Sequence, residues 1–118
     1  MRQSMRVLVV SAVAAGLLAV PATAQAATKL TAIVGPAFNI TLKMGTKKVT
    51  RLKAGKYTIT VRDRSNIHNF HLKGLGVNKD SGVKFVGTKT WTVTLRKGTY
   101  VYVCDPHKSS MRGTFKVV

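Results

Sequence analysis

The stretch TWTVTL, from Thr90 to Leu95, decides the fold of this chain, because its side chains alternate strictly between polar and apolar. Trp91, Val93 and Leu95 fall on one face of an extended segment, and the threonines fall on the other. A period of two is typical of an antiparallel strand with one face in a core and the other in water. We therefore expect a half-buried β-strand here.

The same alternation recurs in two other stretches. YTITV, residues 57–61, places its first, third and fifth side chains on one face, and FNITLK, residues 38–43, does so with Phe38, Ile40 and Leu42. Glycines lie between these stretches, and no later window has the pattern of an amphipathic helix. Short strands separated by turns predict an all-β fold, a Greek-key β-sandwich or barrel of about 7–8 strands.

A short internal repeat links two of the predicted turns. LKAGKY, residues 52–57, and LRKGTY, residues 95–100, share the pattern L-[KR]-x-G-x-Y, and each leads into a strand that is followed by a histidine. A repeat of only six residues is also compatible with the ordinary composition of hairpins. If it is structural, both strands belong to one Greek key and carry the histidine segments to the same end of the sandwich.

The N-terminal residues 1–26 have the features of a secretory signal peptide. Two arginines precede an apolar stretch of 14 residues that begins at Val7, and small residues spaced for cleavage end at Ala24 or Ala26. The apolar stretch is shorter than the roughly 18 residues that a membrane-spanning helix needs. We therefore expect residues 27–118 to form a single domain that is exported to a periplasm, a cell wall or the extracellular space.

The chain is strongly basic, with 20 Lys and Arg against 3 acidic residues and a formal net charge of +17. Removal of residues 1–26 takes away two arginines and leaves a charge of +15. Such a charge favours anionic partners, although single lysines spread along a chain also fit a generally basic surface. An acidic redox protein, an anionic cell wall and a membrane surface all fit, whereas nucleic acid does not, because the chain looks exported and has no recognition-helix pattern.

The only cysteine, Cys104, opens the stretch CDPHKSSM, residues 104–111. A lone cysteine in an exported protein pairs with another chain, stays a free thiol or binds a ligand. His107 and Met111 lie in the same stretch, and thiolate, imidazole and thioether ligands together favour copper. Taken singly, each of these residues also has an ordinary structural explanation, as a buried cysteine, a surface histidine or a core methionine. Their combination predicts a copper site that needs one more histidine.

His68 is the best candidate for that second histidine. In an extended chain, positions 68 and 71 point to opposite faces, so a register that buries His68 and Phe70 leaves His71 outside. The alternative register buries His71 together with Asn69, and an unpartnered buried amide costs roughly 1–3 kcal/mol. We therefore expect His68 to face inward.

The order of these residues resembles that of a known family. HNF, residues 68–70, is followed by Y-x-Y-x-C-x-P-H-x-x-x-M-x-G, residues 100–113, as in the small cupredoxins of the plastocyanin, pseudoazurin and amicyanin type. The resemblance covers essentially all of residues 27–118. It implies a cupredoxin-like sandwich that binds one copper ion, cycling between Cu(I) and Cu(II). The implied ligands are His68, Cys104 and His107, with Met111 as a long axial ligand.

The resemblance also implies roles for neighbouring residues. Asn69 would join its segment to the Cys104 loop and offer a backbone N–H to the sulfur. Pro106 has no N–H, so the thiolate would accept fewer hydrogen bonds and the reduction potential would be lower. Gly98-x-Tyr100 is similar to the tyrosine corner of Greek-key sandwiches.

Four protein ligands would leave no open position for a substrate, so we do not expect an enzyme. Beyond those ligands only His71 remains, which is too few for the second copper centre of an oxidase. We expect a monomeric, exported blue-copper protein that carries one electron at a time. The alternative is a copper carrier or buffer that delivers copper to an exported or membrane oxidase, and a wall-associated domain with a vestigial site is a third possibility.

We expect electrons to leave through the ring edge of His107, because this residue lies on a loop at the end of the sandwich. The resemblance implies a small apolar docking surface that is built from loops at the same end. Its expected residues are Pro36, Ala37, Gly74, Gly76 and Pro106. The +15 charge would steer a redox partner with an acidic surface, an effect that salt screens over about 8–10 Å.

Overall fold

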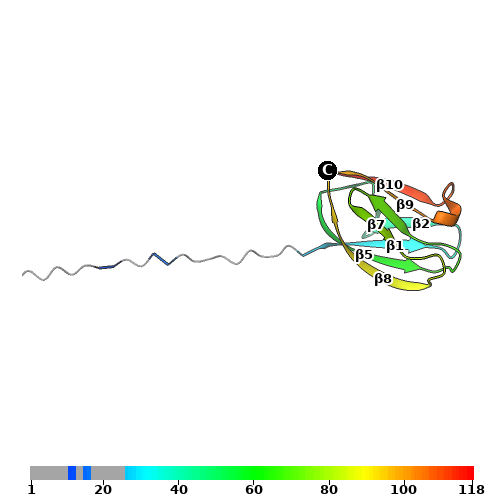
Figure 1. Ribbon diagram of the computed structural model, residues 1–118, viewed down its shortest axis with the longest axis horizontal. Coiled ribbons are helices and arrows are strands. Elements are labelled where there is room, and N and C mark those ends of the chain that lie inside the picture. The colour runs from blue at the N-terminus through cyan, green and yellow to red at the C-terminus, as the bar shows by residue number, and fades with distance from the viewer. Residues whose placement is uncertain (1–10, 13–14, 17–25) are drawn as a thin grey trace, which may run out of the picture.

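The computed structural model describes residues 11–12, 15–16 and 26–118 (Figure 1). Most of the expected signal peptide, residues 1–26, therefore lies outside the described residues. In the described part, no helix has the length and apolar character needed to cross a membrane. The strands are β1 Thr28–Val34, β2 Ile40–Met44, β3 Lys47–Lys48, β4 Arg51–Leu52, β5 Gly55–Asp63, β6 His71–Gly74, β7 Val77–Asp80, β8 Gly87–Leu95, β9 Gly98–Val103 and β10 Arg112–Val117, with a short 3₁₀ helix, η1 Asp105–His107.

Two five-stranded sheets face each other, with the orders β3-β2-β1-β5-β8 and β4-β10-β9-β6-β7. Most neighbouring strands are antiparallel, but β1 pairs with β5 in parallel and β10 pairs with β4 in parallel. Strands that are distant in sequence are thus neighbours in space, because the chain crosses between the two layers. The predicted all-β sandwich is confirmed, and eight of its ten strands are four residues or longer.

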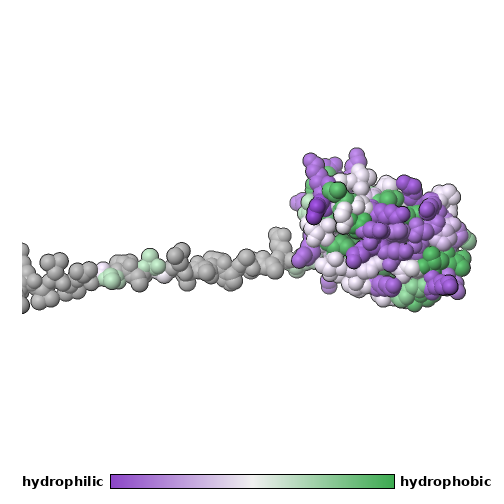
Figure 2. Space-filling model, viewed as in Figure 1, coloured by the Kyte–Doolittle hydropathy of each residue, from purple (hydrophilic) through white to green (hydrophobic). Residues whose placement is uncertain are grey.

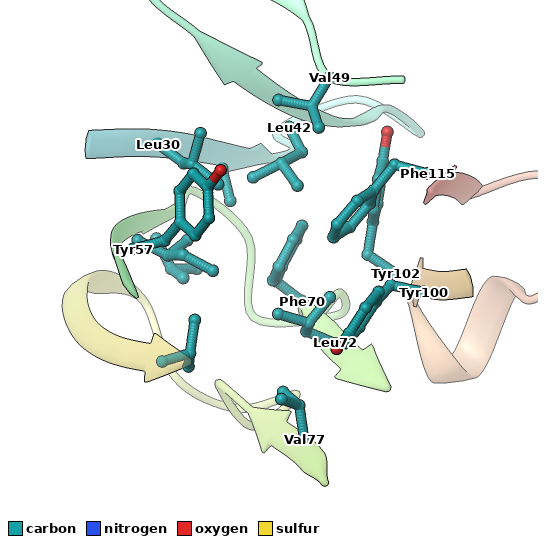
Figure 3. Close-up of a cluster of buried hydrophobic side chains, with 14 of the residues drawn as sticks. Leu30, Leu42, Val49, Tyr57, Phe70, Leu72, Val77, Tyr100, Tyr102 and Phe115 are labelled. Atoms are coloured by element: carbon teal, nitrogen blue, oxygen red, sulfur yellow. The ribbon is translucent and has the colours of Figure 1, made fainter. Parts of the chain in front are cut away.

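The core lies between the two sheets and follows the predicted alternation. Ile59, Val61, Val93 and Leu95 are buried on the inner face of one sheet. The other sheet contributes a cluster of aromatic rings, in which Phe70 stacks on Tyr102 and Tyr100 stacks on Phe115, with centroids 5.4 and 5.3 Å apart (Figure 3). Offset ring pairs of this kind add to the free energy gained from burying apolar area.

The short internal repeat corresponds to a repeated local structure, because both of its tyrosines make the same hydrogen bond. Tyr57 Oη donates to the carbonyl of Lys53 at 2.6 Å, and Tyr100 Oη donates to the carbonyl of Arg96 at 2.8 Å. Each tyrosine therefore anchors the turn that lies four residues before it, as a tyrosine corner does. The two turns lead into β5 and β9, which start at the same end of the sandwich.

The strand registers define two ends of the sandwich. One end, which we name the Cys104 end, holds the residues that follow β1, β5 and β9, because Val34 pairs with Asp63 and Val103 pairs with both His71 and Arg112. The opposite end holds the first residues of β1, β5 and β9 together with Val118 at the C-terminus (Figure 1).

Candidate metal centre

The four expected ligands lie on two segments at the Cys104 end. Cys104 directly follows β9, His107 closes η1, and Met111 directly precedes β10. His68 lies on the irregular segment between β5 and β6. Because this segment is not an extended strand, the expected alternation does not apply there, and His68 is buried together with both Asn69 and Phe70.

The loop from Cys104 to Met111 is closed by backbone hydrogen bonds. The N–H of Cys104 donates to the carbonyl of Met111 at 3.0 Å, and the N–H of Met111 donates to the carbonyl of His107 at 2.9 Å. The N–H of His107 in turn donates to the carbonyl of Cys104 at 3.0 Å. These bonds hold three of the four expected ligands in one tight turn, and the side chains of Cys104 and Met111 are fully buried.

Three donor atoms converge on one point. Nδ1 of His68 lies 3.1 Å from Nδ1 of His107, and Cys104 Sγ lies 3.7 and 3.5 Å from these two nitrogens. The point equidistant from the three atoms lies about 2 Å from each, close to the usual metal–nitrogen and metal–sulfur distances of about 2.0–2.3 Å. The donor set and its spacing therefore fit a single metal ion bound by His68, Cys104 and His107.

The buried ring of His68 is positioned by packing. Its second nitrogen, Nε2, is buried and has no hydrogen-bond partner among the described residues. Gly35, at a φ of 68°, lies against this ring, and a Cβ at that position would come within 3.0 Å of Ser65 Cβ and 3.3 Å of His68 Cδ2. A side chain is therefore disfavoured at Gly35 both by backbone conformation and by space.

Phe38 is a site residue that the sequence pattern misplaced. The alternation of residues 38–43 predicted an inward-facing Phe38, but β2 begins only at Ile40, and the Phe38 side chain is 62% exposed. Its ring covers the two histidines, with centroids 5.1 Å from His68 and 4.8 Å from His107. The loop that begins at Gly35 places it there, and the only sequence signal was an aromatic residue directly after a Gly-Pro-Ala turn.

Asn69 connects the His68 segment to the Cys104 loop. Its Oδ1 accepts a hydrogen bond from the N–H of Asp105 at 2.7 Å, and its Nδ2 donates to the carboxylates of Asp105 at 2.7 Å and Asp80 at 2.8 Å. The buried amide thus has three partners, so the expected cost of burying it does not arise. In the described residues, the polar neighbours of Cys104 Sγ are the Nδ1 atoms of His68 and His107, and no backbone N–H of Asn69 or of the η1 turn that contains Pro106 is among them.

His71 lies beside the site without sharing in it. Its Nδ1 is 2.8 Å from Asp105 Oδ2, and its Nε2 is 2.6 Å from Asn78 Oδ1. Burial alone would raise the pKa of Asp105, but the hydrogen bonds from Asn69 and His71 and the nearby positive charges outweigh it and hold that pKa below its usual value. The charged carboxylate of Asp105 is therefore stabilised at the position where it accepts hydrogen bonds from Asn69 and His71.

The expected docking residues divide between the two ends. Pro36, Ala37 and Pro106 are exposed, on loops at the Cys104 end. Gly74 and Gly76 do not join them: a Cβ at Gly74 would meet the ring of Tyr100, near the start of β9. The expectation that all five residues gather at one end is therefore wrong for these two glycines, because β6 starts at the Cys104 end and runs away from it.

The geometry defines a class of protein, a small β-sandwich with one metal centre formed from two histidines and a cysteine. The family of copper binding proteins of the plastocyanin/azurin type matches residues 31–118. The chain belongs to this family, whose cofactor is copper, and its His68–Cys104–His107 cluster suits one copper ion.

Solved structures show the same fold. Reduced rusticyanin is 23% identical, with a TM-score of 0.57, covering 76% of this chain and 78% of that one. A mutant of rusticyanin at 1.5 Å is 22% identical, with a TM-score of 0.57 and 76% of each chain covered. A mutant of amicyanin with Cu(I) is 21% identical, with a TM-score of 0.51, covering 77% of this chain and 83% of that one. No curated protein matches the chain in sequence.

Proposed function

We propose that this chain is an exported one-electron carrier with a type 1, or blue, copper site. The observation that carries the proposal is the convergence of two imidazole nitrogens and one thiol sulfur on a single buried point. Copper bound there would exchange one electron between Cu(I) and Cu(II). Family membership supports the proposal, and the solved relatives include a reduced rusticyanin and an amicyanin with Cu(I).

We assign the axial ligand position to Met111. Its side chain is fully buried, and its backbone is hydrogen-bonded to both Cys104 and His107, so it belongs to the loop that supplies two of the other ligands. A fourth protein ligand would fill the coordination sphere and leave no position for a substrate. The proposed role is accordingly electron transfer without catalysis.

His107 is the proposed route for the electron. Its ring is only partly buried, whereas His68 is fully buried. Phe38 and Pro106 are exposed apolar residues on the loops beside it, so a partner that packs on them would come close to the His107 ring. Basic residues flank the same end and support an acidic partner; they are Arg64, Lys108 and Arg112.

Export forms part of the proposal because of the signal-like residues 1–26. A role in delivering copper is the less favoured alternative, because three of the four ligands are fully buried and hydrogen-bonded loops close over them. Copper transfer to an acceptor protein needs ligands that the acceptor can reach. An electron carrier needs only one ligand ring near the surface, which His107 provides.

The test is optical. Residues 27–118, mixed with Cu(II), should develop an intense blue thiolate-to-copper band with one copper per chain. Cys104→Ser and His68→Ala should each remove it. His71→Ala is the matched control, because His71 lies beside the site but outside the donor triangle, and it should keep the band. A wild-type protein that binds Cu(II) without a blue band would disprove the proposal.

A further inference from the structure

The acidic side chains of the sandwich are confined to one of its two ends. The only three acids of the chain are Asp63, Asp80 and Asp105. All lie at the Cys104 end, because Asp63 ends β5, Asp80 pairs with His71, and Asp105 follows Cys104. The opposite end therefore carries basic side chains with no acidic side chain near them, and we name it the basic end.

The basic end is built from turns that backbone hydrogen bonds hold together. Gly55 pairs with Leu95, Gly98 pairs with Val117, and the N–H of Ala54 donates to the carbonyl of Val118 at 2.9 Å. Six exposed basic residues lie on these turns and the adjoining strand ends: Arg51, Lys53, Lys56, Arg96, Lys97 and Lys116. In residues 26–118 the one ion pair is that of His71 with Asp105, so none of the six is neutralised.

Three large apolar side chains are exposed among these basic residues, and two of them are Leu75 and Val118. Leu75 is 56% exposed and Val118 is 45% exposed. Leu75 lies beside Gly98, because a Cβ there would lie 4.0 Å from Leu75 Cβ. Val118 directly follows Val117, which pairs with the same glycine. Figure 2 shows hydrophilic residues, with apolar ones between them, at the end of the domain where the N-terminal trace joins it.

A hollow of about 490 Å³ opens at the same end. Arg51, Lys53 and Lys56 line it together with Met44, the third exposed apolar residue, whose side chain is 45% exposed. Three cationic side chains around one hollow can approach a single phosphate group from several sides.

We propose that the basic end docks on an anionic lipid surface, with the phosphate headgroups held by its lysines and arginines and with Leu75 and Val118 reaching the acyl boundary. An anionic membrane interface binds surfaces on which basic side chains surround exposed apolar ones. A soluble polyanion would bind the basic side chains but would make no favourable contact with the apolar ones. Docking in this orientation turns the Cys104 end away from the membrane toward redox partners.

The experiment is co-sedimentation of residues 27–118 with vesicles, and it needs no copper. All buried side chains of the described residues lie between Leu30 and Val117, so this segment contains a complete core. Vesicles of mixed phosphatidylglycerol and phosphatidylcholine should bind the protein, and pure phosphatidylcholine vesicles should not. The double variant Lys53→Gln, Lys97→Gln should weaken binding about 25-fold, at about fivefold for each basic side chain near the surface.

A charge-matched control separates a docking surface from net charge. Lys84→Gln with Lys108→Gln removes the same charge from exposed positions at the Cys104 end and should leave vesicle binding within about twofold of wild type. Equal losses in both double variants would show that binding follows net charge alone, and would overturn the proposal. So would equal binding to the two kinds of vesicle.

A third arm separates lipid from a soluble polymer. Leu75→Ser with Val118→Ser should weaken binding to the anionic vesicles and leave binding to soluble polyphosphate unchanged. If the serine variant binds vesicles as well as wild type does, and polyphosphate binding depends on Lys53 and Lys97, the basic end is a polyanion site and the lipid assignment is wrong.

Discussion

The ring of Phe38 meets the ring of His107 edge to face, with centroids 4.8 Å apart and planes at 85°. The same ring lies 5.1 Å from His68, so one exposed side chain covers both imidazoles of the donor triangle. An apolar cover of this kind keeps water from the ligand rings and lowers the local polarity, which is one of the means by which a protein tunes a metal centre.

Phe38→Ala should therefore lower the reduction potential of the copper-loaded protein. Water admitted to the two rings stabilises the more highly charged oxidised state over the reduced state. Ile67→Ala is the control, because Ile67 is another exposed apolar residue, 49% exposed, next to His68 in sequence. Voltammetry should show a shift for the first variant only, and equal potentials for Phe38→Ala and wild type would contradict the proposed cover.

Asn69→Ala should destabilise the domain by about 2–4 kcal/mol, because it removes a buried amide that bonds two carboxylates and one backbone N–H. Asn78→Ala removes only an exposed partner of His71 and should cost about 0.5 kcal/mol or less. Urea denaturation midpoints measure both. A similar small loss in the two variants would mean that the Asn69 network contributes little to stability.

The two tyrosine corners predict a graded series of Phe variants. Tyr100→Phe loses a donated and an accepted hydrogen bond, and Tyr57→Phe loses one, so each should cost about 1–2 kcal/mol. The hydroxyl of Tyr102 is buried near the backbone of Leu42 but makes no hydrogen bond of good geometry in the described residues, so Tyr102→Phe should cost less than either of the other two variants. Thermal unfolding of the three variants tests this order, and a large loss in Tyr102→Phe would contradict it.

Asp63 predicts a pH dependence of stability. Burial raises the pKa of its carboxyl group, although a hydrogen bond from the N–H of Ser65 and nearby positive charges oppose the rise. The folded state therefore favours the neutral acid, and its contribution to stability falls as the pH rises from the usual carboxyl pKa through the raised value. Asp63→Asn cannot ionise, so its unfolding free energy should lose this slope and exceed that of wild type above the window. An unchanged slope in urea titrations across mildly acidic pH would refute the assignment.

Removal of copper should leave the domain folded but less stable. The core that joins the two sheets consists mainly of side chains remote from the donor triangle, so it does not depend on the metal. A ligand that binds only the native state adds RT ln(1 + [L]/Kd) to stability. Circular dichroism of the metal-free protein should keep its β-sheet signal, with a lower melting temperature than the copper form. A random-coil spectrum would contradict the prediction.

The sequence by itself determined the strands and the ligand loop. The period of two in Thr90–Leu95 specifies which side chains are buried, because successive side chains of any strand point to opposite faces. The spacing from Cys104 to Met111 brings ligands together within a single closed turn, so no distant segment is needed to predict their proximity. The repeated tyrosine pattern is local in the same way, because each hydroxyl reaches a carbonyl four residues back.

Only the tertiary structure decided which residues lie together at each end of the sandwich. His68 faces inward as the sequence predicted, but it does so because an irregular segment turns there and not because of strand alternation. Phe38 covers the histidines because its strand begins two residues later than the pattern predicted. The sequence-based prediction placed Gly74 and Gly76 at the Cys104 end, but they lie at the opposite end, because the end that a loop occupies depends on the direction of its strands. The separation of the three acids from the basic end has the same cause. The order of charged residues in the sequence does not show at which end they lie, because each strand crosses the sandwich and places successive turns at opposite ends.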